Sequence, residues 1–331
     1  MKKILMLTTG GTIAGEHTDT GLVPVYAGEQ LVSMVPELRE LCELECKDIM
    51  QLDGTNVQPE DWITMAEAVY DAQDEYDGVI ITHGTDTMAY SACAVSLMVQ
   101  NLRKPVIFTG SQIALIDPDS DGRRNLTDAV HAAMSGIPGV YVVFCGRLIR
   151  GIRSQKLYTR DLDAFHSINA EDAGRIEDGK VILNQEIPMP EGDLVLDTKL
   201  EPKVVQLKLL PGIEPKQLES MLGMGYYGII LEAFGCGGIP NQQRNLLPCL
   251  KRAKQFGVAV MIATQCKYGY VDLTVYDVNV QAAREGALSV YDMSIEAAAV
   301  KLMWVLGHTK NLDEVRKMME TCYVGEFTEK K

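Results

Sequence analysis

The sequence predicts an α/β fold with two domains, of which the first and larger is a doubly wound, mainly parallel sheet flanked by helices. Three observations support this prediction. Short apolar runs alternate with amphipathic stretches from the first residues onward. The apolar runs are almost continuously hydrophobic, which is typical of strands buried on both faces of a parallel sheet. The length of 331 residues is sufficient for two domains, each with its own buried core.

Four apolar runs in the first half of the chain indicate buried strands. Between them lie two stretches with helical periodicity, at Pro59–Gln73 and Thr87–Asn101, and Asp86 is placed to cap the second helix. This alternation of strands and helices favours parallel pairing, with helices on both faces of the sheet. The predicted strands are Ile4–Leu7, Val79–Thr82, Val106–Thr109 and Val140–Phe144.

The composition changes between Asp178 and Pro211, where glycines and prolines are interspersed with charges. This composition predicts a linker that brackets one or two short strands, with a domain boundary near residue 200. We therefore assign residues 1–190 to an N-terminal α/β domain, 191–210 to the linker and 211–331 to a smaller C-terminal α/β domain with a parallel sheet. Its predicted strands are Lys203–Leu210, Tyr227–Glu232 and Val258–Thr264.

Charge and hydrophobicity exclude two classes of partner. A formal net charge of −14 argues against nucleic acid, because proteins that bind a phosphate backbone concentrate basic charge. No apolar run approaches the roughly 18 residues that a membrane-spanning helix needs. The first seven residues superficially resemble a signal peptide, but their apolar run is short and leads into Thr8-Thr9-Gly10-Gly11 without a cleavage site. A buried first strand explains them better, and we expect a cytoplasmic protein.

The eight cysteines indicate neither a metal site nor a disulfide framework. Cys42 and Cys46 form the closest pair, with three residues between them, and no CxxC pair or histidine cluster accompanies them. We expect buried apolar thiols.

Polar side chains gather just after three of the predicted strands. They lie in Thr8-Thr9-Gly10-Gly11-Thr12, in His83-Gly84-Thr85-Asp86 and in Gly110-Ser111-Gln112. In open parallel sheets, ligands bind beyond the carboxyl ends of the strands. These three segments are therefore the first places to look for a functional site.

Thr12 lies in a glycine-rich turn after the first predicted strand. Gly10 and Gly11 allow backbone conformations that other residues avoid, and they let a ligand approach closely. A threonine hydroxyl in this position can attack an acyl carbon if another group takes its proton. The alternative is a loop that binds phosphate, although the sequence GGTIAG matches neither GxGxxG nor GxxxxGK[ST].

Two further segments could supply the proton acceptor. Thr85 and Asp86 follow a strand and precede a helix, where simple helix capping is the alternative to catalysis. Next to them, His83 is either a base or a packed neutral ring, and we favour the packed ring. Lys156 could accept a proton if burial, or the neighbouring Arg150 and Arg153, lowered its pKa, but in sequence this segment looks like a basic surface loop.

Together these segments identify a family. The chain closely resembles the bacterial-type L-asparaginases, and within them the type I, cytoplasmic branch. The resemblance covers essentially the whole chain, and its first two motifs are highly specific in combination. The matching segments are TGGTIAG at Thr9–Gly15, HGTDTMAYSA at His83–Ala92, KPVIFTGSQ at Lys104–Gln112, SDGRRNL at Ser120–Leu126, RGIRSQK at Arg150–Lys156, FGCGGIPN at Phe234–Asn241, ATQCKYG at Ala263–Gly269 and DMSIEAAAVKL at Asp292–Leu302.

The resemblance implies the two-domain asparaginase-type fold and a role for each catalytic residue. Thr12 would be the nucleophile that is acylated, and Thr85, Lys156 and Asp86 would form the proton relay. Asp86 would also bind the substrate ammonium group. Backbone N–H groups near Thr12 and Thr85, with Gly11 and Thr85 as the named donors, would stabilise the oxyanion. No metal or cofactor is implied.

The resemblance also implies residues that bind the substrate, L-asparagine. The Ser111–Ala114 segment would lie near the leaving amide nitrogen. The family grips the α-carboxylate with a segment that often has a serine where this chain has Gly54. The Gly54 N–H and the Thr55 hydroxyl could replace that donor. The full set of substrate-binding residues implied is Asp53, Gly54, Thr55, Gly84, Asp86, Ala114 and Tyr276.

Two further features distinguish this chain from the family that it resembles. The mobile loop, Gly15 to Gly28, often holds a tyrosine over the nucleophile, whereas the aligned residue here is Leu22; Tyr276 is the expected replacement, ahead of Tyr26. Some type I enzymes bind asparagine at a regulatory site beside the cysteine that matches Cys266. An arginine often found there corresponds to Glu232, which would repel a carboxylate, so we expect weak or absent allostery.

The resemblance leaves other functions to be weighed. Glutamine deamidation is one alternative, either of free glutamine or in the amidase subunit of a tRNA-dependent amidotransferase. Such subunits carry an additional N-terminal domain, whereas the first strand here starts at Ile4 and the chain is acidic. A binding protein without catalysis is disfavoured because Thr12, Thr85, Asp86 and Lys156 are all present. The family assembles its active sites between subunits, so a homodimer or homotetramer is implied.

Overall fold

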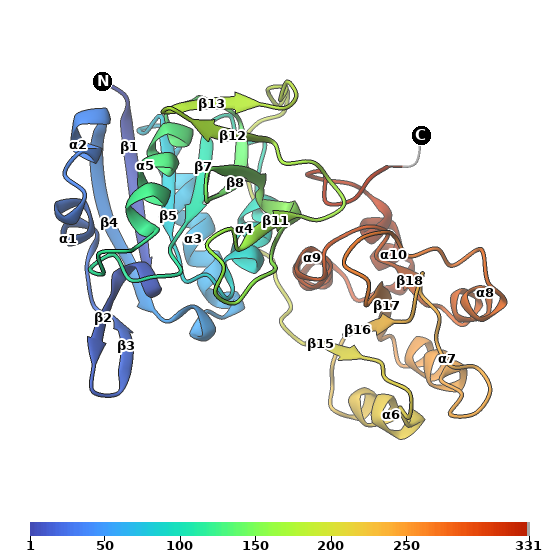
Figure 1. The fold of residues 1–331 in the computed structure, drawn as a ribbon. Helices are drawn as coiled ribbons and strands as arrows, with labels where there is room; N and C mark the ends of the chain where they lie inside the picture. Colours follow the sequence, from blue (N-terminus) through green and yellow to red (C-terminus); the bar gives the residue numbers. More distant parts are fainter. Residues whose placement is uncertain (330–331) are drawn as a thin grey trace. The chain divides into compact units, whose positions relative to one another are not determined.

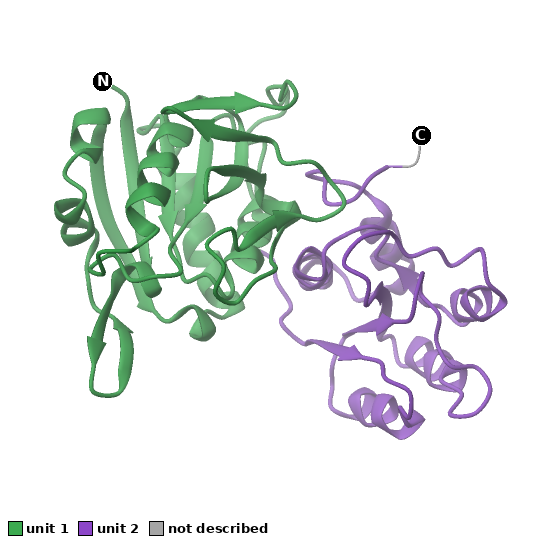
Figure 2. Ribbon diagram, viewed as in Figure 1, with its two compact units in different colours: residues 1–198 green, residues 199–331 purple. Residues whose placement is uncertain are grey.

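The computed structural model describes residues 1–329, and the chain divides into two compact units. The first comprises Met1–Thr198 and the second begins at Lys199 (Figure 2). This division falls within the segment expected to connect two domains. Each unit has its own sheet and helices.

An eight-stranded sheet forms the centre of the first unit (Figure 1). Its order is β13-β12-β9-β8-β7-β5-β1-β4. The five strands from β8 to β4 are parallel, and β9, β12 and β13 extend the sheet with antiparallel pairing. The bounds are β1 (Lys3–Gly10), β4 (Glu43–Leu52), β5 (Gly78–Thr82), β7 (Pro105–Thr109), β8 (Gly139–Phe144), β9 (Arg147–Arg150), β12 (Gly174–Glu177) and β13 (Lys180–Leu183).

Helices cover both faces of this sheet, as the alternation of strands and helices predicts. On one face, α1 (Gly28–Met34), α2 (Leu38–Leu41) and α5 (Gly122–Ala133) bury a core with alternate residues of the central strands, among them Ile4, Met6, Ile80 and Ile107. On the other face, α4 (Met88–Met98) packs on β7 and β8, and α3 (Pro59–Ala72) packs on α4 (Figure 1). Burial on both faces explains why the central strands are hydrophobic throughout.

Several short elements complete the first unit. Two of them are antiparallel hairpins, in which β2 pairs with β3 and β10 pairs with β11. Three single turns of 3-10 helix, labelled η, follow β1, β4 and β9. The bounds are η1 (Thr12–Ala14), β2 (Gly15–Thr18), β3 (Gly21–Pro24), η2 (Gly54–Asn56), β6 (Val99–Gln100), η3 (Gly151–Arg153), β10 (Ser154–Lys156), β11 (Phe165–Ser167) and β14 (Val195–Leu196).

The second unit is a smaller α/β structure. Its four parallel strands have the order β15-β16-β17-β18. None of the helices between residues 1 and 329 combines the length and the apolar character that crossing a membrane requires. The bounds are β15 (Val204–Lys208), α6 (Pro215–Gly223), β16 (Gly228–Ala233), α7 (Leu247–Gln255), β17 (Ala259–Thr264), α8 (Asp277–Arg284), β18 (Leu288–Ser289), α9 (Ile295–His308) and α10 (Leu312–Glu320).

The four strands predicted in the first half, and the three predicted later, are confirmed as β1, β5, β7, β8, β15, β16 and β17. The helix predictions are confirmed by α3 and α4. The predicted cap of α4 is wrong, because Thr87 occupies the N-cap position and the Asp86 carboxylate instead binds Lys156. The edge strand β4 was not predicted.

Candidate active site

The order of the parallel strands marks where a ligand site is expected. Read from β4, the five strands follow the pattern 2-1-3-4-5 in chain order, so the direction of winding reverses between β1 and β5. Crevices at the carboxyl ends of strands form at such a switch point. The turns that carry Thr12 and Thr85 follow β1 and β5 respectively, and they are therefore neighbours.

Three glycines bring these turns into direct backbone contact. A Cβ atom added to Gly11 would lie 2.4 Å from the Gly84 nitrogen, and one added to Gly84 would lie 2.5 Å from the Gly54 Cα. Both distances are shorter than any side chain permits. The loops after β1, β4 and β5 can therefore pack together only because each contributes a glycine, and this packing places Thr12 and Thr85 next to each other.

Thr12 is the first residue of η1 and is half-buried. The preceding Gly11 has φ 76° and ψ −179°, a backbone conformation that favours glycine. The Gly11 N–H donates to the Leu52 carbonyl at 2.8 Å. This bond holds the turn against β4, and the Gly11 conformation presents Thr12; a role of Gly11 as an oxyanion donor stays a prediction.

Lys156 joins the two polar residues that follow β5. Its Nζ donates to Thr85 Oγ1 at 2.7 Å and to Asp86 Oδ1 at 2.8 Å. The Lys156 side chain is only 16% exposed, whereas that of Asp86 is 55% exposed. The ammonium group therefore fixes the Thr85 hydroxyl from the protein side and leaves one carboxylate oxygen of Asp86 open to solvent, where a cationic ligand group can bind it.

The segment that carries Lys156 is not the basic surface loop that its composition suggests. Residues 151–155 are buried, and Arg153 is only 3% exposed. The segment runs through η3 into β10, which pairs with β11 through Lys156 and Phe165. Arginine is so rarely buried that its presence in a sequence normally indicates surface. The buried backbone gives Lys156 the fixed position that a proton relay requires.

Gln112 links Thr85 to the loop between β10 and β11. Thr85 Oγ1 donates to Gln112 Oε1 at 3.3 Å, and Gln112 Nε2 donates to the Asp161 carbonyl at 3.0 Å. The Gln112 and Ile113 N–H groups donate to the Asp121 carboxylate, each at 3.0 Å. Asp121 thus holds the segment after β7, which includes the buried Ala114, beside the Thr85 hydroxyl.

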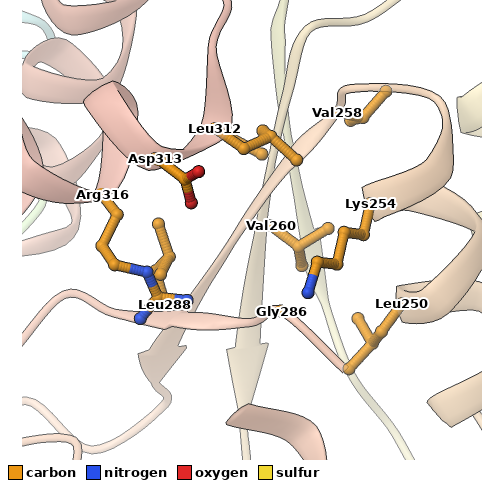
Figure 3. A pocket seen from close by; sticks show the side chains of 10 residues that line it. Leu250, Lys254, Val258, Val260, Gly286, Leu288, Leu312, Asp313 and Arg316 are labelled. Atoms are coloured by element: carbon orange, nitrogen blue, oxygen red, sulfur yellow. The ribbon is translucent and has the colours of Figure 1, made fainter. Parts of the chain in front are cut away.

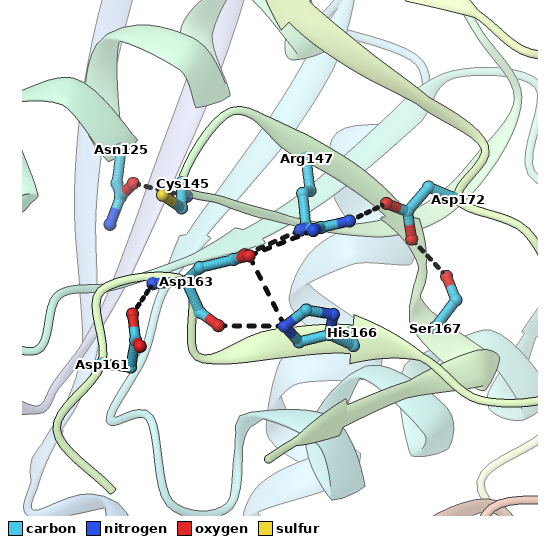
Figure 4. A network of polar contacts seen from close by, with 8 residues as sticks. All are labelled: Asn125, Cys145, Arg147, Asp161, Asp163, His166, Ser167 and Asp172. Atoms are coloured by element: carbon cyan, nitrogen blue, oxygen red, sulfur yellow. Dashed lines mark hydrogen bonds and ion pairs between the residues drawn. The ribbon is translucent and has the colours of Figure 1, made fainter. Parts of the chain in front are cut away.

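A network of charged groups anchors the other side of the same loop (Figure 4). Arg147 donates two hydrogen bonds to Asp163, at 2.7 and 3.0 Å, and one to Asp172 at 2.6 Å. The Arg147 guanidinium holds the pKa of the Asp163 carboxyl below its ordinary value. A two-pronged contact of this kind fixes both position and orientation. The loop that reaches Gln112 is therefore held from both sides.

Asp53 and Thr55 form a closed pair at the end of β4. Both the N–H and the hydroxyl of Thr55 donate to Asp53 Oδ1, at 2.9 and 2.6 Å, and these bonds lower the pKa of the Asp53 carboxyl. The Thr55 hydroxyl proton is therefore used within the turn. This arrangement does not support the idea that the Thr55 hydroxyl replaces the missing serine donor.

Gly54 itself is held tightly. A Cβ atom at this position would lie 3.0 Å from the Gly84 Cα and 3.1 Å from its carbonyl carbon, and the Gly54 carbonyl accepts a hydrogen bond from Thr87 Oγ1 at 2.5 Å. The absence of a serine thus coincides with a close backbone contact, in which a side chain fits only if the Gly84 backbone shifts by a few tenths of an ångström. Reintroducing a side chain requires the Gly84 backbone, next to Thr85, to move.

We predict that Gly54→Ala and Gly54→Ser both lower the free energy of unfolding, by about 1–3 kcal/mol, because both overpack the contact with Gly84. The matched pair separates the two roles of the position. Only serine adds a hydroxyl donor, so a lower KM for Gly54→Ser than for Gly54→Ala would report a restored carboxylate contact. Urea unfolding and steady-state kinetics provide the measurements. An alanine variant with native stability would contradict the packing argument.

The loop expected as a lid is the hairpin of β2 and β3. Its outer residues are exposed, and His17 Nε2 lies 3.1 Å from both carboxylate oxygens of Asp117, on the segment after β7. Leu22 lies opposite His17 in the hairpin, and Tyr26 packs against the buried core. Burial and the nearby Glu16 raise the pKa of Tyr26. Tyr26 therefore serves the packing of the loop base.

Three other expected residues belong to the second unit. Tyr276 precedes α8 and is 59% exposed. Cys266 is also exposed, and its N–H donates to Thr264 Oγ1. Glu232 Oε1 accepts a hydrogen bond from Gln206 Nε2 at 2.6 Å. These side chains lie on the strand ends and loops of the second sheet, and their roles remain proposals.

A cavity in the second unit is too small to compete as a substrate site (Figure 3). Its volume is about 50 Å³, far below the roughly 300–1,000 Å³ of typical ligand sites. Lys254, Asp313 and Arg316 line it together with aliphatic side chains. An amino-acid amide does not fit there.

Sequence reasoning brought together Thr12, Thr85, Asp86 and Lys156, and it missed the residues that hold them. In the sequence, Gln112 stands out only as part of a polar segment after a predicted strand. Nothing in the sequence distinguishes Asp121 and Arg147 from other charged residues. The Gly110-Ser111-Gln112 cluster was the available signal for Gln112, whereas the bonds of Asp121 and Arg147 arise only in the folded chain.

Comparisons with known domains and proteins agree along the whole chain. Residues 3–189 match the asparaginase N-terminal domain, and residues 203–319 match the glutaminase/asparaginase C-terminal domain. The chain is 41% identical to an L-asparaginase of Thermococcus kodakarensis, over 98% of this chain and 99% of that protein. The solved structure of the thermostable L-asparaginase from the same organism matches with a TM-score of 0.95 at 41% identity, covering 99% of this chain and all of the other.

Relatives of a second kind match less completely. A glutamyl-tRNA(Gln) amidotransferase component from Pyrococcus abyssi is 38% identical over 99% of this chain but only 77% of its own length. By contrast, the structure of L-asparaginase I from Vibrio cholerae has a TM-score of 0.89 at 33% identity, and the match covers 99% of both chains. Among the proteins compared above, those that match over the full length of both chains are asparaginases.

Proposed function

The chain belongs to the L-asparaginase family and is an L-asparagine amidohydrolase, and we propose that Thr12 is the nucleophile in its hydrolysis of L-asparagine to L-aspartate and ammonia. The observation that carries this proposal is the bonding of Lys156. Its ammonium group binds Thr85 and Asp86 at the turn that is in backbone contact with the Thr12 turn. A nucleophile and the group that manages its proton must lie within reach of each other.

In the proposed reaction, Thr12 Oγ1 attacks the side-chain amide carbon of asparagine. The Thr12 hydroxyl proton passes to Thr85 Oγ1, which Lys156 and Gln112 orient, as Thr85 gives its own hydroxyl proton to the leaving nitrogen. Ammonia departs and leaves a β-aspartyl ester on Thr12. Water, activated by the same relay, hydrolyses this ester and regenerates the hydroxyl. Thr85 therefore takes a proton from the attacking oxygen and supplies one to the leaving group, both in the formation of the ester and in its hydrolysis.

The substrate is held by charge and by shape in this proposal. The open carboxylate oxygen of Asp86 binds the α-ammonium group, a charge-assisted bond that selects an amino acid. The Gly54 N–H contributes to binding the α-carboxylate, and Ala114 borders the leaving amide. The Thr85 N–H stabilises the oxyanion. Tyr276 of a neighbouring subunit closes the site, which requires a homo-oligomer, and the protein acts in the cytoplasm.

The experiment that tests the function measures ammonia release by the native chain from L-asparagine and from L-glutamine, each over a range of concentrations. We expect turnover of asparagine with a higher kcat/KM than for glutamine. A preference for glutamine would instead favour the activity of the amidotransferase relatives. The same asparagine series tests regulation: Glu232, in place of the arginine often found at the regulatory site, predicts a hyperbolic curve, and a Hill coefficient clearly above one would contradict that prediction.

A further inference from the structure

His83 is a fully buried polar side chain next to the candidate active site, and the proposed reaction does not use it. The ring is completely buried. Its Nδ1 lies 2.7 Å from the carbonyl oxygen of Gly84, and its Nε2 lies 2.9 Å from Ser91 Oγ, one turn into α4. Both ring nitrogens are therefore engaged, one by the backbone of the catalytic turn and the other by a helix of the core.

The two contacts determine which nitrogen carries the proton. A carbonyl oxygen can only accept a hydrogen bond, so Nδ1 must be the donor to Gly84. Burial lowers the pKa of His83 to about 4, so the ring is neutral at physiological pH and Nε2 has no proton. Nε2 consequently accepts a hydrogen bond from the Ser91 hydroxyl. The Gly84 carbonyl thus selects the tautomer, and Ser91 supports it by donating to the unprotonated Nε2.

The carbonyl that His83 holds belongs to the same peptide unit as the Thr85 N–H. In a planar trans peptide the C=O and the N–H point in opposite directions. Because the imidazole binds the Gly84 carbonyl from the buried side, the Thr85 N–H is turned away from the core. In the proposed function, this N–H group donates the hydrogen bond that stabilises the oxyanion.

We propose that His83, fixed by Ser91, is a positioning residue that orients the Gly84–Thr85 peptide so that the Thr85 N–H faces the oxyanion of the reaction. The inference rests on the proposed function for the identity of the reaction, and it adds a new role to a residue that has no contact with substrate in that scheme. An oxyanion donor acts only when it is already aimed at the developing charge.

The proposal makes a direct prediction about the native chain. Histidine labelled with 15N in the ring distinguishes protonated from unprotonated nitrogen by chemical shift, and His83→Asn identifies the signals that belong to His83. At neutral pH we expect His83 to show a protonated Nδ1 and an unprotonated Nε2. The opposite tautomer would overturn the proposal, because the ring could not then donate to Gly84.

Two substitutions of His83 separate orientation from packing. Asparagine carries its amide nitrogen at the same distance from Cβ as histidine Nδ1 and can still donate to Gly84, whereas leucine has the same branching without a donor. We expect His83→Leu to lower kcat by about 10- to 100-fold with little change in KM, because the oxyanion exists only after attack. His83→Asn should stay within about tenfold of native kcat.

Stability provides the discriminating readout. A polar asparagine in a buried site should be less stable than leucine, so a purely structural role predicts that activity follows melting temperature and that leucine is the better replacement. A higher kcat for His83→Asn than for His83→Leu, despite the lower melting temperature of the asparagine variant, supports the proposal. A kcat of His83→Leu equal to that of His83→Asn would overturn it. His308→Leu is the matched control, since His308 Nδ1 likewise contacts a backbone carbonyl, that of Trp304, at 2.8 Å in the second unit. Its kcat should be unchanged.

Ser91→Ala keeps the test decisive if His83→Leu fails to fold. Without the serine hydroxyl, Nε2 loses its donor, and the preference for the tautomer protonated at Nδ1 is weakened. We expect a lower kcat with unchanged inhibition by L-aspartate, together with a detectable fraction of protonated Nε2 in the 15N spectrum. Native kcat and a single native tautomer would overturn the role of Ser91. Failure of the proposed function is recognised separately, because the native chain would then release no ammonia from asparagine.

Discussion

Replacing Thr12 with valine is expected to lower kcat for asparagine by about 10⁴-fold or more, since removal of a nucleophile leaves only binding and electrostatic contributions. Valine has nearly the shape of threonine and lacks only the hydroxyl. Thr12 is half-buried at the start of η1. Because valine is β-branched like threonine, we expect the backbone there to keep its conformation. The loss should therefore be chemical, with the fold and the binding of L-aspartate retained.

Thr12→Ser is the matched control for this prediction, because it keeps a hydroxyl in the same turn and should keep measurable turnover. Ammonia release is measured with protein prepared from a host that lacks its own asparaginases, so that trace contamination cannot mimic residual activity. Turnover by Thr12→Val within tenfold of the native value would show that another group attacks the substrate. Loss of L-aspartate binding in the same variant would show that the turn itself had been disturbed.

The strands that position Thr12 were predictable because of their burial. β1, β5, β7 and β8 are covered by helices on both faces, so nearly every residue in them is apolar and the pattern is visible without any other information. β4 was missed for the converse reason. It is the edge strand, and its residues, from Glu43 to Leu52, alternate in burial and include several charges that face solvent.

The catalytic groups were predictable only in part. Thr12 and Thr85 follow strands directly, and the position of a polar residue after a buried strand is visible in sequence. The contact that brings them together, between Gly11, Gly84 and Gly54, joins residues far apart in the chain. A glycine in sequence shows that a side chain is absent, and it does not show which backbone occupies the space.

Buried charge is the feature that sequence reasoning handled least well. The Arg150–Lys156 segment looks exposed because it holds three basic residues, yet Arg153 is buried and the Lys156 side chain is largely so. Asp86 looked like a helix cap because it precedes a helix. Local spacing cannot distinguish a capping carboxylate from one that binds a lysine seventy residues later, as Asp86 does. Such assignments depend on tertiary contacts.

Loss of the hydrogen bond between Lys156 and Thr85 is expected to cause the second large decrease in kcat. Lys156→Met should lower kcat by about 10²- to 10⁴-fold, the range attributed to a positioned acid–base group. Methionine fills most of the space of the lysine stem but cannot hold the Thr85 hydroxyl. The Asp86 carboxylate is half exposed and remains available to the substrate ammonium group. Inhibition by L-aspartate should therefore change far less than kcat, which distinguishes loss of the relay from loss of the binding site.

Lys156→Arg and Lys180→Met complete this experiment. Arginine keeps the positive charge, but its planar guanidinium cannot reproduce the two bonds of a compact ammonium group, at 2.7 Å to Thr85 and 2.8 Å to Asp86. It should therefore lose most of the activity as well, which charge alone would not predict. Lys180 is an exposed lysine on β13 of the same unit, and its replacement should leave kcat unchanged. If Lys156→Met retains native kcat, the proton of Thr12 leaves by another route, and the geometry around Thr85 serves only to hold the turn.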